Sequence, residues 1–144
     1  MKESQRIIKL FNDLYEGSPW IGENIKGTLE NISAEKAARK IIPGKNSIWE
    51  IAIHMVRWRE TLLERLQGNK IPSPDHNYFE PVTDRSNAAW KKTLEELKAS
   101  QVDWINFLEV IDEPTLEKNY DDIQGIIQHD AYHLGQVVMM GKMA

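Results

Sequence analysis

Two histidines near the C-terminal end of the sequence, His129 and His133, have a spacing that suits metal binding. Residues four apart lie one turn apart on the same face of a helix, so two imidazoles at this spacing can reach one ion. A third histidine, His54, belongs to another segment with a helical pattern. Three imidazoles from two packed helices would leave a metal ion an open coordination position of the kind that supports chemistry.

The apolar residues around the histidine pair indicate that it faces the protein interior. At about 100° per residue, Ile126 and Val137 share the helix sector of the two histidines. A polar group buried there without a partner costs roughly 1–3 kcal/mol. The pair therefore requires a specific partner, whereas His54 alone is more typical of a hydrogen-bonded core histidine. Asp130 follows His129, so the His-Glu-x-x-His pattern of metalloproteases is absent.

Polar residues near the histidines have two interpretations each. Asp130 and Gln136 lie close in helical phase to the second histidine of the pair, and either could orient a ligand or bind a backbone group. Glu50, one turn before His54, could act as a base near a metal, although helix capping explains it more simply. His76, in a proline-rich segment, is interpreted as a solvated side chain unless that loop folds over the site. No residue is assigned a catalytic role.

Length and composition predict one compact domain, residues 1–144. The chain has 41% hydrophobic residues and a formal net charge of -4, which argues against nucleic acid as a partner. It contains no cysteine, so a transition-metal site must use imidazole and carboxylate ligands. No signal peptide is visible, and no apolar run approaches the roughly 20 residues of a membrane span. A cytoplasmic protein without a membrane partner is the expectation.

The first half of the chain is predicted to be helical. Ile7, Leu10 and neighbouring apolar residues recur at three and four positions in a first helix that weakens at 17–19. Ser18 and Pro19 are typical of a cap and a first helical position, and Trp20 to Ile32 are expected to continue the apolar face. A short capped helix follows at 33–39.

Three further segments have clear helix signals. Ser47-Ile-Trp-Glu50 predicts a capping box at the start of a long helix that Gly68 ends. Another helix is expected from Asp84 or Ser86 to about 111, followed by a loop marked by Pro114. The last helix is expected from 121–123 to about 140. Four of the tryptophans are interpreted as core or interface residues, with Trp58 the one most suited to border a pocket (the four are Trp49, Trp58, Trp90 and Trp104).

Residues 69–82 contain three prolines and cannot form a helix. A stretch of this length is explained by a crossover along the length of a helical bundle. Because no segment shows strand alternation, the predicted fold is an all-α four-helix bundle with this crossover between its second and third helices.

Several segments together resemble the DinB-like family of small helical metalloproteins, also called the DinB/YfiT-like superfamily. The matching segments are 46–59, which reads NSIWEIAIHMVRWR, 129–136, which reads HDAYHLGQ, the Ala-Ala-Trp90 start of a helix and Gly17-Ser-Pro-Trp20. The similarity spans nearly the whole chain. One departure follows Trp20, where related chains frequently carry a histidine and this one reads Ile21-Gly-Glu-Asn.

The resemblance implies an up-down-down-up four-helix bundle in which His54, His129 and His133 bind one divalent metal, with zinc or nickel the usual assignments. Homodimers are common in the family, and the apolar stripe at 137–143 is a reasonable contact for one. Some relatives are S-transferases or isomerases that use a low-molecular-weight thiol. Since this chain has no cysteine, a reacting thiol would have to come from such a partner.

Three functions remain open at this point. The first is a metal-dependent enzyme, a thiol S-transferase or a related hydrolase acting on a small-molecule substrate. The second is a non-catalytic metal-binding bundle with a stress-response or partner-binding role. The third is a bundle in which the ion only stabilises the fold. An open coordination position beside a pocket would favour the enzyme, whereas a fourth protein ligand would favour a structural role.

Overall fold

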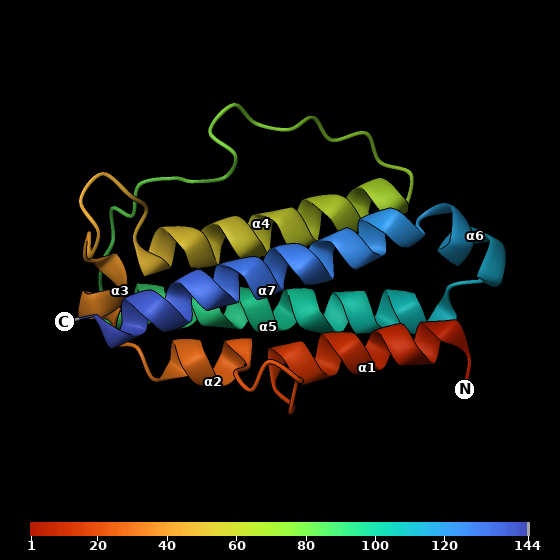
Figure 1. Ribbon diagram of the computed structural model, residues 1–144. Coiled ribbons are helices and arrows are strands. Elements are labelled where there is room, and N and C mark those ends of the chain that lie inside the picture. The colour runs from red at the N-terminus through yellow and green to blue at the C-terminus, as the bar shows by residue number, and fades with distance from the viewer. Residues whose placement is uncertain (144) are drawn as a thin grey trace.

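The computed structural model describes residues 1–143, and these form seven helices and no strand (Figure 1). The helices are α1 (Glu3–Tyr15), α2 (Ile25–Glu30), α3 (Ala34–Ala38), α4 (Ile48–Leu66), α5 (Asn87–Val110), α6 (Glu113–Lys118) and α7 (Tyr120–Lys142). The prediction of an all-α chain is confirmed. The sequence predicts fewer elements, because its patterns do not separate the short helices α2 and α6 from their neighbours.

The four long helices α1, α4, α5 and α7 lie lengthwise beside one another (Figure 1). α4 and α5 run in the same direction, opposite to α1 and α7. α4 packs against both α5 and α7, and α1 packs against the same two helices. The connection 67–86 returns along the outer side of α4 (Figure 1), so that α5 can begin at the end where α4 begins. The predicted loop 69–82 lies within it and is not helical.

The signals at the ends of α4 are mostly confirmed. The Ser47 hydroxyl accepts a hydrogen bond from the backbone N–H of Glu50 at 3.1 Å, which caps the helix as predicted. The reciprocal half of the capping box is wrong, because the Glu50 carboxylate accepts from the Lys40 ammonium and from the Ser47 hydroxyl instead. Gly68, with a φ of 98°, follows the helix in the left-handed conformation that favours glycine.

The predicted resumption of helix at Ser18 and Pro19 is wrong. Pro19 to Gly22 form a tight turn, closed by a 2.9 Å bond from the Gly22 N–H to the Pro19 carbonyl. Gly22 has a φ of 87°, which carries the chain away from a helical path. Trp20 is consequently fully exposed, and α2 begins only after Asn24, whose side chain accepts from the Gly27 N–H at 2.7 Å.

The predicted loop around Pro114 is also wrong, because Pro114 lies in the first turn of α6. The Asp112 side chain caps this helix by accepting from the Thr115 N–H at 2.8 Å. Proline is well tolerated at the first turn, where its missing N–H would have no helical partner. The preference for proline in the first turn of a helix, which failed at Pro19, holds at Pro114. Here a capping aspartate lies two residues before the proline.

Three of the tryptophans are buried, as predicted, and each indole N–H donates to a fixed acceptor. Trp49 bonds the Thr93 hydroxyl at 3.0 Å, and Trp104 bonds the Arg59 carbonyl at 2.9 Å, so both join α4 to α5. Trp90 bonds the Ile32 carbonyl at 2.9 Å. These directional contacts fix how α4 lies on α5. None of the helices within residues 1–143 combines the length and apolar character that a membrane span requires.

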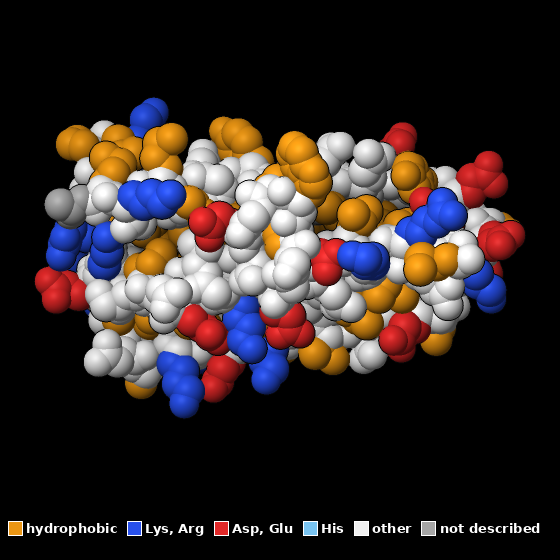
Figure 2. All heavy atoms as spheres, turned by 60° about the horizontal axis from the view of Figure 1, so that its bottom comes forward, with side chains coloured by type: hydrophobic (Ala, Val, Ile, Leu, Met, Phe, Trp, Pro, Cys, Tyr) orange, Lys and Arg blue, Asp and Glu red, His pale blue; other side chains and the backbone are white. Residues whose placement is uncertain are grey.

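The surface drawn in Figure 2 carries intermixed acidic and basic side chains, and hydrophobic side chains gather at its upper left edge. That end of the molecule is where Figure 1 places the end of α7. Large apolar side chains of α7 and the residue after it are exposed, with 68% of Tyr132, 66% of Met139 and 39% of Met143 accessible. An apolar surface of this kind at one end of a helix is suited to contact with another molecule.

Candidate metal centre

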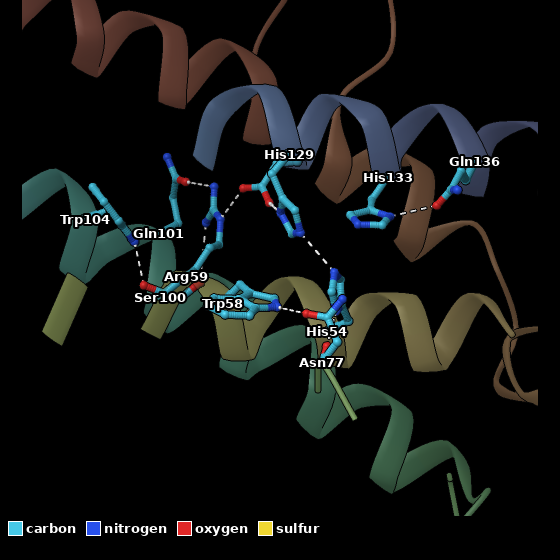
Figure 3. A network of polar contacts seen from close by, with 11 residues as sticks. His54, Trp58, Arg59, Asn77, Ser100, Gln101, Trp104, His129, His133 and Gln136 are labelled. Carbon is cyan, nitrogen blue, oxygen red and sulfur yellow. Dashed lines mark hydrogen bonds and ion pairs between the residues drawn. The ribbon is translucent and has the colours of Figure 1, made fainter. Parts of the chain in front are cut away.

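α4 and α7 bring the three predicted histidines together. One ring nitrogen from each of His54, His129 and His133 lies within 4.8 Å of the other two. Figure 3 shows the two α7 histidines pointing toward His54 on α4. The Nε2 atoms of His54 and His129 are 2.9 Å apart, and the His133 ring stands edge-on to both rings. Within residues 1–143, no other group of three histidine or acidic side chains is placed to hold an ion.

The second ring nitrogen of each histidine, Nδ1, faces an oxygen acceptor. The three contacts are His54 to the Asn77 carbonyl at 2.5 Å, His129 to Asp130 Oδ1 at 3.2 Å and His133 to Gln136 Oε1 at 2.7 Å. Carbonyl and carboxylate oxygens only accept, so each Nδ1 donates its hydrogen. In the neutral ring, Nε2 then presents a lone pair to the centre of the cluster.

This arrangement fits a cation between the rings. Two lone pairs 2.9 Å apart, on the Nε2 atoms of His54 and His129, would repel each other. Burial lowers the pKa of His54 to about 4, although its bond to the Asn77 carbonyl raises the pKa and the nearby His133 lowers it again. Burial also lowers the pKa of His133. Since protonation of His54 and His133 is disfavoured in this way, the donor set fits a divalent metal, whose ligand is the neutral imidazole.

The support of His129 continues into a buried polar network (Figure 3). Asp130 is fully buried, and its Oδ2 accepts from Nε of the equally buried Arg59 at 2.7 Å. The same guanidinium donates to Ser100 Oγ at 3.3 Å and to Gln101 Oε1 at 2.9 Å. Gln101 in turn donates to Asn12 at 3.1 Å. Asp130 thus faces an imidazole, one of the two roles that the sequence left open, and its other oxygen accepts from an α4 side chain instead of from a backbone group.

The support of His54 comes from the connection between α4 and α5. Asn77 and Tyr78 have φ angles of 53° and 60°, a left-handed pair that is uncommon outside glycine. The Asn77 backbone carbonyl faces His54, while its side-chain oxygen accepts from the Trp58 indole N–H at 2.8 Å. The centroid of the Phe79 ring lies 3.9 Å from that of the His54 ring, and the two rings are nearly parallel. The crossover therefore covers the site and holds one of its rings.

Two residues with open interpretations lie outside the cluster. His76 is half-exposed, pairs with Glu80 at 3.3 Å and accepts from the Tyr78 N–H, which agrees with the solvated interpretation. Glu50 is held by Lys40, so its carboxylate is engaged in an ion pair instead of serving as a base beside the cluster. The loop reaches the site as the sequence allowed, but through Asn77 and not through His76.

The sequence analysis missed three supporting residues, namely Arg59, Asn77 and Phe79. Arg59 follows Met55 by four positions on the apolar stripe of α4, and an arginine in an apolar register is a signal of a buried ion pair. Asn77 had a weaker signal, because asparagine tolerates the left-handed region better than most residues. Nothing local identifies Phe79, since its contact with His54 depends on the path of the whole loop.

A pocket of about 480 Å³ opens beside His133. Its walls come from α7, from the first turns of α4 and from the segment that precedes them, and Phe79 of the crossover contributes as well. Gln136, which holds the His133 ring, also lines it. Trp58 does not line this pocket, contrary to expectation, because its indole is bonded to Asn77. A substrate in this pocket would lie next to one wall of the candidate metal centre.

Fold and site together define an all-helical protein with a buried three-histidine candidate metal centre. The chain belongs to the DinB superfamily, whose sequence model matches residues 21–137. That range contains all three histidines and both helices that carry them. Comparisons with curated proteins and with solved structures found no match. The family resemblance drawn from the segments around His54 and His129 is confirmed.

Proposed function

We propose that this chain binds one divalent transition metal, zinc or nickel, through Nε2 of His54, His129 and His133. The observation that carries the proposal is the orientation of the rings: each Nδ1 donates to an oxygen, so three Nε2 lone pairs converge. Family membership supports it, because DinB-like proteins bind metals. When bound, such an ion would lower the pKa of a thiol or water at its open position.

In the proposed reaction, the sulfur of a low-molecular-weight thiol bonds to an electrophilic carbon of a small-molecule substrate, whose leaving group departs with the bonding electrons and takes up the thiol proton. No fourth histidine or acidic ligand joins the cluster within residues 1–143, which leaves the open position available for a thiol. The chain itself has no cysteine to supply one. Phe79 and the buried Arg59–Asp130 pair would exclude water from two sides, and Gln136 would hold His133 in place. A cytoplasmic location belongs to this proposal, because thiols are kept reduced there.

The proposed helix order and oligomeric state also rest on the family resemblance. We propose that α1, α4, α5 and α7 form an up-down-down-up four-helix bundle within one domain, supported by their directions in Figure 1. We also propose a homodimer through the apolar stripe at 137–143, where Met139 and Met143 are exposed. A monomer in solution sizing at micromolar concentration would contradict the dimer.

Metal content tests the first part of the proposal. Protein purified without a metal-affinity tag is expected to carry one equivalent of metal by elemental analysis, and His54→Ala and His133→Ala are expected to lose it. His76→Ala is the matched control, because this histidine is half-exposed and lies outside the cluster. Full metal retention by both cluster variants would refute the ligand set.

Thiol consumption tests the second part. The protein is mixed with an electrophilic probe and several low-molecular-weight thiols, before and after a chelator removes the metal. Conjugation that disappears with the metal and returns with added zinc or nickel is expected. Activity that survives metal removal would contradict a metal-activated thiol. A protein that holds metal and conjugates none of the thiols would favour the non-catalytic alternative, a metal-binding bundle with a stress-response or partner-binding role.

A further inference from the structure

The pocket beside His133 has a charge that contrasts with the rest of the chain. None of its ten lining residues is acidic, although the chain contains 22 aspartates and glutamates. Lys45 is its one lysine or arginine. Lys45 is exposed, and its backbone N–H donates to the Ile42 carbonyl at 3.1 Å in the turn before α4. The pocket is thus suited to an anionic group.

The remaining walls are apolar except for four uncharged side-chain types, those of Asn46, Tyr132, His133 and Gln136. Ile42, Ile51, Phe79 and Met140 supply apolar surface. Gln136 uses its side-chain oxygen to accept from His133, so the amide nitrogen is the part left to donate. A volume of about 480 Å³ falls in the range of small-molecule sites, which are mostly apolar with a few polar groups that set orientation.

We propose that this pocket binds an apolar carboxylate, with its hydrocarbon body against the isoleucine, methionine and phenylalanine walls. Its carboxylate lies at the rim, where the Lys45 ammonium and the Gln136 amide donate to it. Charge complementarity carries this assignment, because a cationic ligand would find no acidic partner in the lining. That this ligand is the substrate of the thiol transfer rests on the proposed function, whereas the binding preference of the pocket does not.

Calorimetric titration of the metal-free full-length chain tests the preference. The probes are octanoate, octanol and octylamine, which share a hydrocarbon chain and differ in the charge of the head group. Removal of the metal ensures that a carboxylate–metal bond cannot produce the result. Octanoate is expected to bind most tightly and octylamine least. Octanol or octylamine binding as tightly as octanoate, or no binding by any of the three, would overturn the proposal.

Variants of Lys45 test the role of its charge. Lys45→Gln is expected to weaken octanoate binding by about threefold, the size typical of a solvent-exposed ion pair. Lys45→Glu is expected to reverse the order of octanoate and octylamine. Lys98→Glu is the matched control, because Lys98 is an exposed lysine on α5 outside the pocket. An equal response to Lys45→Glu and Lys98→Glu would refute a local role for Lys45.

The same titrations separate this proposal from the proposed function. If the metal-free chain prefers octanoate but the purified protein contains no metal, the pocket assignment stands and the metal centre is refuted. One equivalent of metal with no octanoate selectivity would do the reverse.

Discussion

The two sides of the candidate metal centre are held by different kinds of structure. On α7, His129 and His133 are oriented by Asp130 and Gln136, side chains of their own helix. On α4, His54 is oriented by a backbone carbonyl of a loop residue 23 positions away. The α7 side is therefore built by local helix geometry, and the α4 side depends on the folding of a long connection.

The two sides also differ in how deeply their supporting contacts are buried. Asp130 is anchored by the buried Arg59, whose guanidinium also reaches α5 through Ser100 and Gln101. The loop is held to α4 by hydrogen bonds that are only part-buried or exposed, and it keeps two residues in the left-handed region at a conformational cost. Perturbing the α7 side should therefore affect the stability of the whole fold, whereas perturbing the loop should affect mainly the site.

The largest effect is expected from Arg59→Met. It leaves Asp130 buried without its partner, which should lower the free energy of unfolding by about 3–5 kcal/mol in urea denaturation. Arg57→Met is the control on the same helix, and it should cost about 1 kcal/mol or less because its partners, Glu60 and Glu96, are partly exposed. Equal losses in the two variants would contradict the anchoring role of Arg59.

The next effect concerns the loop, where Asn77→Val should weaken metal binding by about 10–100-fold. Valine is strained at a φ of 53°, so the carbonyl that faces His54 should turn away. Asn77→Gly keeps that backbone conformation and loses only the bond to Trp58, so it should bind metal more tightly than the valine variant. Competition with a chromophoric chelator measures both affinities, and equal values would refute the role of the carbonyl.

A smaller effect is expected from Gln136→Ala on the α7 side, about tenfold in metal affinity, because the His133 ring loses its Nδ1 acceptor. Gln136→Glu restores an acceptor at the same position and should recover most of the affinity. The same chelator competition applies. If the alanine variant bound metal like the original chain, the packing around His133 would suffice to orient it.

The smallest effect is the pH dependence of stability in the metal-free chain. The pKa of His54 is lowered by burial to about 4, so the folded state binds fewer protons than the unfolded state below the ordinary histidine pKa. Stability should be complete above about pH 6.5 and decline toward pH 4, with less than about 1 kcal/mol lost through His54 between pH 7.5 and 6. His54→Gln should reduce this slope, and stability that rises on acidification would contradict the assignment.

Much of the fold could be predicted because its signals are local. Helical periodicity and the Ser47 and Ser86 caps located α4 and α5, and the prolines of 69–82 excluded a helix there. The errors at Pro19 and Pro114 share one cause. The fixed φ and the missing N–H of proline suit both the first turn of a helix and a tight turn, so proline alone does not distinguish them. The helix begins where a capping side chain is available, which is Asn24 in one case and Asp112 in the other.

The candidate site also has one part that the sequence predicts and another that depends on distant contacts. The spacing and helical phase of His129 and His133 can be derived from the sequence, because residues on one helix have a known relation to each other. The assignment of His54 as the third ligand came from the family resemblance, which the superfamily match supports. The roles of Arg59 and Asn77 could not be derived, because they depend on contacts with residues 71 and 23 positions away.

The sequence by itself determined that the chain is helical, that it has no thiol ligand of its own and that two histidines share an inward face. These properties follow from composition and from the fixed period of the helix. Only the tertiary structure decided that a left-handed turn at Asn77 holds His54, that Arg59 is buried against Asp130, and that a pocket with one lysine adjoins His133. Each depends on where separate segments meet, which local patterns do not specify.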